Sequence, residues 1–353
     1  MVPNTEGGVK EPVAHGGDLR DVQRRFPTAP RPWIDLSTGI NPISYPLPEL
    51  GLESWTRLPS HDDEAALRVA AARRYGAPDP EAIVAAPGTQ ALIQLLPRLV
   101  PRSRVAVLGP TYEEHETSWR RQGHDVCVVR ELAEATDADV VVAVNPNNPT
   151  GRLLATDELR AVRGMLVLDE AFIDLHPQTA SLAGEPPENT VILRSFGKTY
   201  GLAGVRLGFA IGGRAIVERL RDELGPWAVS GSAIEVGRIA LGDDRWLGTT
   251  ASRLTEIGRR LDGLLVNAGF ELLGGTALFR LAAHARAARA ADILASHGVH
   301  VRSFENEPAW LRFGMPLEGS QLDRLAGALG QFSMAGPSAN VAGRAFSASS
   351  QTR

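Results

Sequence analysis

Between residues 82 and 224, short apolar runs alternate with longer segments in which apolar residues recur at helical spacing. Short apolar runs bounded by turn residues are typical of buried strands, and the segments between them are typical of amphipathic helices. Their alternation predicts an α/β fold, with a mainly parallel central sheet that helices cover on both faces. Strands are expected at 82–86, 104–108, 126–129, 139–144, 165–168, 190–194 and 206–211, and helices at 62–75, 89–99, 112–122, 153–163 and 214–224.

The pattern changes near residue 230, where long helices (232–268) are followed by short strands that alternate with helices. This change predicts a smaller C-terminal α+β domain. Its strands are expected near 270–273, 277–282, 299–303 and 310–313, and its helices near 286–297 and 319–330. Residues 31–50 are rich in proline, which favours an extended arm over a helix. The expected division is a mobile tail (1–14), an N-terminal arm (15–50), a large domain (51–229), a small domain (230–332) and a second mobile tail (333–353).

Composition narrows the classes of protein that fit this pattern. The net charge of −4 provides no basic footprint for nucleic acid. No apolar run approaches the length of a membrane helix, about 18 residues, and the N-terminus lacks the apolar core of a signal peptide, so a cytoplasmic location is expected. The single cysteine, Cys127, lies in an apolar run and is expected to be a buried thiol. One cysteine is consistent with a reducing compartment.

The segment LRSFGKTYGLAGVRLGF, residues 193–209, is the strongest indication of chemistry. Lys198 follows Ser195 by three residues and precedes Arg206 by eight, in a chain where arginine far outnumbers lysine. An amine placed between strands, near a hydroxyl and a guanidinium, suits a lysine that forms a Schiff base with a phosphate-bearing aldehyde such as pyridoxal 5′-phosphate. Ser195 and Arg206 would then bind the phosphate. The alternative is an ordinary exposed lysine at the end of a strand.

Two further segments follow predicted strands and suit the same cofactor. In APGTQALI (86–93), the backbone N–H groups of Gly88, Thr89 and Gln90 would face an anion at the start of a helix. The alternative there is a plain helix cap by Thr89. In GPTYEEH (109–115), Tyr112 could stack on the pyridine ring, although a tyrosine that packs in the core fits equally well.

The segments NPNNPTG (145–151) and VLDEAFIDL (167–175) complete the set. Asn148 could donate to the phenolic oxygen of the cofactor, or it could simply form a turn. Asp169 ends an apolar strand, where an unpaired carboxylate is costly, and a protonated pyridine nitrogen would be its partner. An arginine is the alternative partner. Glu170 raises the question of a metal, but no cluster of ligands at metal-binding spacing supports one.

These segments resemble the fold-type I enzymes that depend on pyridoxal 5′-phosphate, and within them the class I and II aminotransferase branch. The resemblance covers about residues 15–330. Within that branch the chain is most similar to the threonine-phosphate decarboxylases of cobalamin biosynthesis, and the histidinol-phosphate aminotransferases are close relatives. The segments that carry the first similarity are HGGD (15–18), IDLSTGINP (34–42), DEAFID (169–174), LRSFGKTYGLAGVRLGF (193–209) and PWAVS (226–230).

The resemblance assigns a role to each candidate residue. It makes Lys198 the Schiff-base lysine and later proton shuttle, Asp169 the partner of the pyridine nitrogen, Asn148 the partner of the phenolic oxygen, and Tyr112 the stacking ring. It places the cofactor phosphate on Gly88, Thr89, Gln90, Ser195 and Arg206. For the substrate it implies Arg302 at a phosphate and Arg312 either at the carboxylate or at the same phosphate, and it places His15 and Asn41 on an arm that lines the pocket.

The chain departs from the relatives at two positions. Phe172 stands where histidinol-phosphate aminotransferases usually have a tyrosine, so Asn148 would hold the phenolic oxygen alone. Leu58-Pro59-Ser60 stands where relatives often have Y-P-D, whose tyrosine reaches the cofactor phosphate across a dimer interface. The resemblance still implies a homodimer, because relatives build the site between two subunits.

The expected reaction is the decarboxylation of L-threonine O-3-phosphate to (R)-1-amino-2-propanol O-2-phosphate. The main alternative is an aminotransferase that acts on a phosphorylated amine such as histidinol phosphate. A regulatory module on the same fold would require a fused DNA-binding segment, and neither tail is long or basic enough to be one. A dinucleotide-binding dehydrogenase is disfavoured, because no G-x-G-x-x-G follows the first strand.

Overall fold

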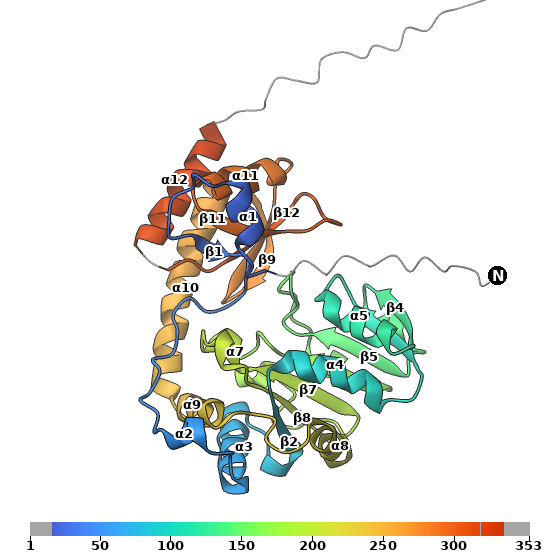
Figure 1. The fold of residues 1–353 in the computed structure, drawn as a ribbon. Coiled ribbons are helices and arrows are strands. Elements are labelled where there is room, and N and C mark those ends of the chain that lie inside the picture. The colour runs from blue at the N-terminus through green and yellow to red at the C-terminus, as the bar shows by residue number, and fades with distance from the viewer. Residues whose placement is uncertain (1–15, 318, 335–353) are drawn as a thin grey trace, which may run out of the picture.

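The computed structural model describes residues 16–317 and 319–334. Within these residues the chain forms two β-sheets, one of seven strands and one of five, with helices packed against each (Figure 1). The predicted tail 1–14 lies outside the described residues, as do residues 335–353 of the second predicted tail and the candidate residue His15.

All seven strands predicted before residue 230 form the larger sheet. Their spatial order is β2-β8-β7-β6-β5-β3-β4, and β8 runs antiparallel to both of its neighbours while the other neighbouring pairs are parallel. The mainly parallel sheet is therefore confirmed. The strands are β2 (Ile83–Ala86), β3 (Arg104–Leu108), β4 (Asp125–Val129), β5 (Val140–Val144), β6 (Met165–Asp169), β7 (Thr190–Ser195) and β8 (Gly208–Gly212).

Helices cover both faces of this sheet. Successive side chains of a strand point to opposite faces, so each strand contributes to two cores. Val140 and Val142 of β5 belong to the core on one face, and Val141 and Ala143 belong to the core on the other. The first face packs against α4 (Thr89–Leu99), α5 (Glu113–Arg121) and α8 (Arg214–Leu224), and the second against α3 (His61–Tyr75), α6 (Thr156–Arg160) and α9 (Gly231–Leu241). Strands buried on both faces are near-continuously apolar, which is why the pattern predicted them well.

The smaller sheet has the order β1-β11-β12-β10-β9 and its own apolar core. Four of its strands, β9 (Glu271–Thr276), β10 (Phe279–Ala283), β11 (Val299–Ser303) and β12 (Trp310–Gly314), were predicted. The helices α10 (Asp244–Asn267), α11 (Ala287–Ser296) and α12 (Ser320–Met334) pack against it through residues such as Leu261, Leu294 and Leu329.

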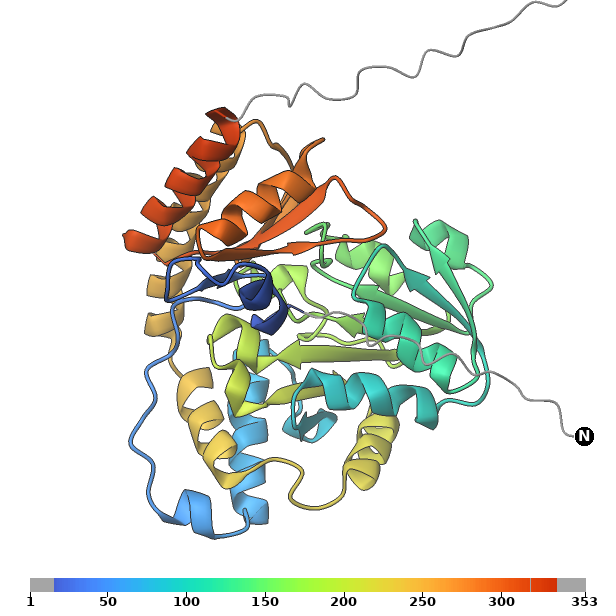
Figure 2. The same ribbon diagram turned by 45° about the horizontal axis from the view of Figure 1, so that its top comes forward.

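The fifth strand of this sheet, β1 (Ile34–Leu36), comes from the predicted arm and was not expected. It pairs in parallel with β11, with Ile34 opposite Val299. Three residues in a proline-rich stretch give no strand pattern, but an edge strand tolerates nearby proline because one side of its backbone has no partner. Figures 1 and 2 show the chain running from β1, at the edge of the smaller sheet, down to α2 (Glu53–Thr56) next to α9.

The remaining elements are short. They are α1 (Arg20–Arg25), α7 (Phe196–Thr199) and the 3₁₀ turns η1 (Pro80–Ala82), η2 (Leu132–Ala135), η3 (Gln178–Ala180) and η4 (Ala203–Val205). Of the helices in the described part of the chain, none is long and apolar enough to cross a membrane.

The prediction that Cys127 is buried is wrong. Cys127 lies on β4, which is the edge strand of the larger sheet, and its side chain is exposed. Val126 and Val129 of the same run are buried. At the edge of a sheet the covering helices do not reach every position, so an apolar run there does not guarantee burial of each residue.

Candidate active site

A cavity of about 570 Å³ lies at the carboxyl ends of the parallel strands and is also lined by β11 and β12 of the smaller sheet. Ligands of open α/β sheets bind at this end of the strands. Nearly all candidate residues with described positions line it, with Asn41 as the exception. Those lining residues are Gly88, Thr89, Gln90, Tyr112, Asn148, Asp169, Ser195, Lys198, Arg206, Arg302 and Arg312.

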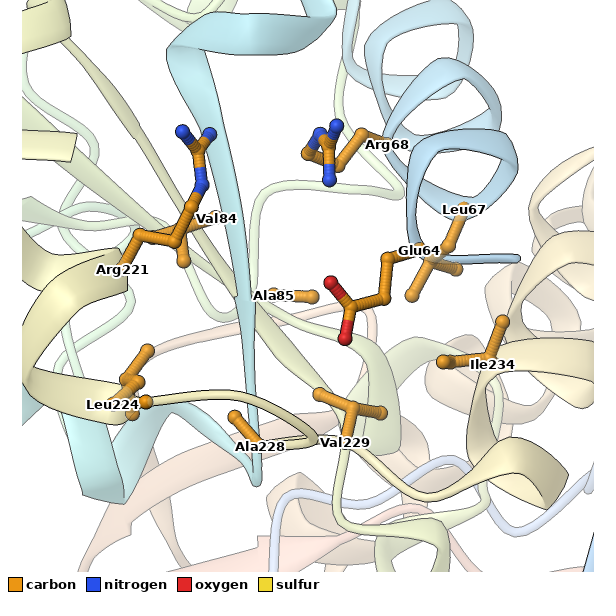
Figure 3. Close-up of a pocket in the computed structure, with 11 residues that line it drawn as sticks. Glu64, Leu67, Arg68, Val84, Ala85, Arg221, Leu224, Ala228, Val229 and Ile234 are labelled. Atoms are coloured by element: carbon orange, nitrogen blue, oxygen red, sulfur yellow. The ribbon is translucent and has the colours of Figure 1, made fainter. Parts of the chain in front are cut away.

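A second cavity is far smaller, about 40 Å³, and shares no lining residue with the first. Figure 3 shows Glu64 and Leu67 of α3 facing Val84 and Ala85 of β2 across it. Its volume suits a few water molecules at most, since one water needs roughly 10–15 Å³ of such space. We therefore place the candidate site in the larger cavity.

Lys198 lies in α7, directly after β7, and projects into the larger cavity. Burial lowers the pKa of its amine to about 8, and the nearby positive charges of Arg312 and Arg206 act in the same direction, while Asp169 opposes them. The Nζ atom is 5.5 Å from the centre of the Phe172 ring. A buried amine whose pKa is close to neutral is suited to act as a nucleophile and as a proton carrier. The exposed-lysine alternative does not hold.

Asp169 ends β6 with its carboxylate buried. One oxygen, Oδ1, accepts a hydrogen bond of 3.0 Å from the backbone N–H of Ala171. The other, Oδ2, is 2.9 Å from Nε2 of His115, which must be the donor because a carboxylate only accepts. Within the described residues Asp169 has no ion pair with an arginine, so the alternative partner considered from the sequence is absent.

His115 was not among the candidate residues. It is buried on α5, three residues after Tyr112, and therefore lies one helical turn away on the same side of the helix. The spacing in GPTYEEH is compatible with this contact, but a lone histidine on a helix gives no signal of its own. Only the proximity of the ends of β3 and β6 reveals it.

Tyr112 lines the cavity and also packs against the core beneath α4. Its stacking on a cofactor ring stays a prediction. Its hydroxyl donates to Oε1 of Gln90 at 3.1 Å, and Nε2 of Gln90 donates to the buried Glu114 at 2.7 Å. Burial, followed by the charges of Glu114 and Asp169, raises the pKa of Tyr112 to about 12. The side chain of Gln90 is thus engaged within the protein, which leaves its backbone N–H for an anion.

The start of α4, where the sequence predicts an anion site, lines the cavity, and one N–H group differs from the expected arrangement. The N–H of Gly88 donates to the carbonyl of Ala86 at 2.7 Å and does not face the cavity. The N–H groups of Thr89 and Gln90 open the helix and have no acceptor within it. Gly88 has a φ of +84°, and a Cβ there would lie 2.5 Å from the guanidinium of Arg206. Its missing side chain therefore makes room for Arg206 beside these N–H groups.

Asn148 is held by the turn after β5 and contacts the smaller sheet. Its Oδ1 accepts a hydrogen bond from Arg312, whose other terminal nitrogen donates to the backbone carbonyl of Ser37 at 2.6 Å. The amide nitrogen of Asn148 is then the group left to donate into the cavity. Both hydrogen-bond partners of Arg312 are neutral groups, and no carboxylate of the described residues forms an ion pair with it.

Arg302 and Arg312 lie directly opposite each other on β11 and β12. Burial, followed by the charge of Arg302, lowers the pKa of Arg312 to about 10. Arg302 also lies over the ring of Phe304, with its guanidinium carbon 5.8 Å from the ring centre. Neither arginine forms an ion pair with a carboxylate in the described part of the chain, so this wall of the cavity is positively charged and suits an anionic ligand.

Glu170 points away from this cavity. It accepts hydrogen bonds from Arg194 at 2.8 Å and from Ser181 at 2.6 Å, and Asp174 binds the same arginine. Burial raises the pKa of Glu170, and Arg194 offsets part of that effect. These contacts anchor the turn that follows Asp169, which gives Glu170 and Asp174 of DEAFID a structural role.

Asn41 is buried and does not line the cavity, which differs from the expected placement. Its side-chain amide donates to the carbonyl of Thr199 at 2.7 Å, behind the lysine. The residues of the arm that do line the cavity are Gly16, Thr38 and Gly39. Thr38 and Gly39 belong to the segment IDLSTGINP of the arm, but neither was a candidate residue. The pairing of β1 with β11 brings them to the cavity.

The environment of Lys198 leads to a testable pH dependence. An amine reacts with aldehydes only when neutral, so reductive methylation of Lys198 by formaldehyde and cyanoborohydride should rise with pH through a midpoint near pH 8 and level off above it. A Lys10→Arg background leaves Lys198 as the single lysine of the chain. In Arg312→Gln the midpoint should move to higher pH, because a positive neighbour that favours the neutral amine is lost.

The rates are measured by peptide mass spectrometry and normalised to free Nα-acetyl-lysine in the same tube. A midpoint near the ordinary lysine value, about 10.4, would show that Lys198 is solvated like a surface residue. An unchanged midpoint in Arg312→Gln would show that the guanidinium does not act on the amine.

Comparisons with known proteins agree with this geometry. The family model "Aminotransferase class I and II" matches residues 48–329. The threonine-phosphate decarboxylase of Pseudomonas aeruginosa is 42% identical over 330 residues, which cover 90% of this chain and 97% of that protein. A threonine-phosphate decarboxylase of a Sinorhizobium species is 40% identical over 336 residues, or 92% of this chain and 99% of that protein.

Among solved structures, the histidinol-phosphate aminotransferase of Sinorhizobium meliloti in complex with pyridoxal-5′-phosphate superposes with a TM-score of 0.78. It covers 90% of this chain and 95% of its own, at 20% sequence identity, so it supports the fold alone. The family match extends over most of the chain, including every strand of the larger sheet. This chain belongs to the class I and II aminotransferase family.

Proposed function

We propose that this protein is a pyridoxal-phosphate-dependent lyase that decarboxylates L-threonine O-3-phosphate to (R)-1-amino-2-propanol O-2-phosphate, a step of cobalamin biosynthesis that takes place in the cytoplasm. The two relatives at 40% and 42% identity, over nine-tenths of the chain or more, are both threonine-phosphate decarboxylases. The observation that carries the proposal is the pair Arg302 and Arg312, which share one cavity with Lys198. A substrate with an amine, a carboxylate and a phosphate matches these three groups.

The residues of the cavity fit the cofactor. Asp169 would pair with the pyridine nitrogen, the amide nitrogen of Asn148 would hold the phenolic oxygen, and Tyr112 would pack on the ring. Thr89, Gln90, Ser195 and Arg206 would hold the phosphate, in the space that Gly88 leaves open because it has no Cβ. When bound, pyridoxal phosphate supplies a ring that accepts the electron pair of a bond broken at the substrate α-carbon.

His115 supports the role proposed for Asp169. By donating to Oδ2, it holds one carboxylate oxygen in place and limits rotation of the group. The backbone N–H of Ala171 fixes the other oxygen, so Asp169 would present its carboxylate to a bound pyridine nitrogen in a fixed orientation. Phe172 lacks the hydroxyl of its counterpart in histidinol-phosphate aminotransferases and packs edge-to-face on Phe279 at 5.1 Å. Asn148 is therefore the residue proposed to bind the phenolic oxygen.

Lys198 would carry the proton steps. With a pKa of about 8, its amine exists in both protonation states near neutral pH. The neutral form can attack the cofactor aldehyde, and the protonated form can deliver a proton from Nζ to the substrate α-carbon after carbon dioxide has left.

Arg312 would control which bond breaks. Its guanidinium is held on one side by Asn148 and on the other by the carbonyl of Ser37, so it offers a bound carboxylate a fixed orientation. Decarboxylation requires the carboxylate to point out of the plane of the cofactor ring, whereas transamination leaves the α-hydrogen in that position. Whether decarboxylation or transamination takes place would then depend on the position of the Arg312 guanidinium relative to the side-chain amide of Asn148.

We also propose that the protein is a homodimer. The segment around α2 exposes four large apolar side chains: Leu47, Leu52, Trp55 and Leu58, each about two-thirds exposed or more. Apolar residues gathered in one segment mark an interaction surface more often than residues scattered singly. Leu58 belongs to the string Leu58-Pro59-Ser60, the position from which relatives reach the neighbouring site.

The product formed from threonine phosphate tests the proposed reaction. The cofactor-loaded enzyme should release carbon dioxide and 1-amino-2-propanol phosphate, without an oxo acid. Formation of pyridoxamine phosphate and an oxo acid would instead indicate an aminotransferase. Mass spectrometry of the products and trapping of labelled carbon dioxide distinguish the two outcomes.

Arg302→Ala should weaken the use of threonine phosphate far more than that of threonine. A hydrogen bond to a charged group contributes about 1.5–3 kcal/mol, so kcat/KM for threonine phosphate should fall roughly 10- to 150-fold. Arg260→Ala, an exposed arginine on α10, is the matched control. Equal losses for both substrates would remove Arg302 from the phosphate site.

Sedimentation equilibrium tests the dimer. The wild-type protein should sediment as a dimer, and the double variant Leu52→Ser/Trp55→Ser should shift toward monomer because it loses apolar area from the contact. Val266→Ser removes an exposed apolar side chain from α10 and serves as the control. A monomeric wild-type protein, or a double variant that dimerises as tightly as the control, would contradict the proposal.

A further inference from the structure

The turn that carries Lys198 depends on another part of the chain for its hydrogen bonds. The helix α7 has four residues, Phe196–Thr199, and so short a helix leaves its last carbonyl groups without intrahelical partners. The arm supplies the donors. The carbonyl groups of residues 198, 199, 200 and 201 accept, in order, from Asn41 N–H at 3.0 Å, Asn41 Nδ2 at 2.7 Å, Tyr45 N–H at 2.8 Å and Ser44 Oγ at 3.0 Å.

Close contact between the arm and this turn requires a glycine. Gly201 has a φ of +64°, and a Cβ at this position would lie 2.6 Å from the carbonyl oxygen of Asn41 and 2.9 Å from Cα of Ser44. Both are backbone atoms, which cannot rotate away. The glycine of the GKTYG string is thereby explained by the approach of the arm rather than by a ligand.

Asn41 is fully committed to this contact. It is 2% exposed, and its Oδ1 accepts from the N–H of Ile43 at 2.9 Å while its amide and backbone nitrogens hold residues 198 and 199. No polar atom of its side chain is therefore left for a ligand. Aspartate in its place would keep the acceptor for Ile43 but would set an oxygen against the carbonyl of Thr199.

The same arm holds the wall of the cavity that faces the lysine. A few residues before Asn41, the carbonyl of Ser37 accepts from Arg312, and Thr38 and Gly39 line the cavity. The carbonyl of Thr38 lies against Gly314 of β12, where a Cβ would collide with it. Residues 37–45 therefore form one strap that contacts the anion-binding arginine at one end and the lysine turn at the other.

We propose that Asn41 is a positioning residue for Lys198, which fixes the turn so that Nζ stays aimed into the cavity. The inference rests on the proposed function in taking Lys198 as the amine that reacts. A displacement of about 1 Å in a reacting group can cost on the order of 100-fold in rate. Among the described residues, Asn41 is the one donor to the carbonyl of Thr199, so removing its side-chain amide leaves that carbonyl without a hydrogen bond.

The test measures how fast and at which pH Lys198 becomes labelled. In a Lys10→Arg background, apoprotein is mixed with pyridoxal phosphate, reduced with borohydride after timed intervals, and assayed by peptide mass spectrometry. Asn41→Asp should slow the labelling of Lys198 by roughly 10- to 100-fold. Its pH midpoint should move above 8, because a loosened turn admits water to the amine. Ser252→Ala removes a bond of the same kind, from a side chain to the carbonyl of Gly248 on the exposed face of α10, and should leave both values unchanged.

Thermal unfolding is followed in parallel, because a merely structural role would lower the unfolding temperature without moving the pH midpoint. Where Asn41→Asp does not fold, Asn41→Ser keeps the backbone bond to residue 198 and is measured in the same way. Hydrogen exchange on the wild-type holoenzyme adds a check that needs no variant, since the amides of Asn41 and Tyr45 should exchange slowly. Rapid exchange of both amides would overturn the proposal.

The failure of this inference is distinguishable from the failure of the proposed function. If wild-type Lys198 takes no label at all, the cofactor assignment fails. If the wild-type protein is labelled and folded Asn41→Asp is labelled at the same rate and midpoint, the cofactor assignment stands and the positioning role of Asn41 is refuted.

Discussion

The site depends on one electrostatic constraint, which is that the Lys198 amine, inside a cavity, must be able to lose its proton close to neutral pH. Burial and the charges of Arg312 and Arg206 disfavour the ammonium form of Lys198, and Asp169 is the carboxylate that opposes them. The contacts with His115 and the N–H of Ala171 hold this carboxylate in place. The charge around Lys198 therefore depends on the contacts that hold the neighbouring side chains in place.

Much of this arrangement could be predicted from the sequence because parallel strands buried on both faces are continuous apolar runs. The residues after β2, β3, β5, β6 and β7 had to converge, since parallel strands that follow one another end at the same edge of the sheet. The positions of the strand ends along the chain therefore predict that one set of residues lies around a single cavity. The structure has all of them there: Thr89, Tyr112, Asn148, Asp169 and Lys198.

What could not be predicted are contacts between segments that no pattern links. In the sequence His115 is one more polar position on a short helix, and nothing marks its contact with Asp169. The motif around Asn41 predicts the segment that it belongs to but not the direction of its side chain, which points to the lysine turn and not into the cavity. Strand β1 is too short for periodicity to detect. The N–H of Gly88 forms a bond with the carbonyl two residues before it, which depends on backbone angles and not on residue type.

The pairing of β1 with β11 has a consequence for how the protein is made. Ile34 leaves the ribosome long before its partner Val299. The larger sheet can collapse while synthesis continues, since its strands are contiguous along the chain, but the wall formed by Thr38 and Gly39 must wait for β11. A nascent chain therefore holds the lysine segment before it holds a closed cavity, and the amine of Lys198 becomes sheltered only after β11 has been made.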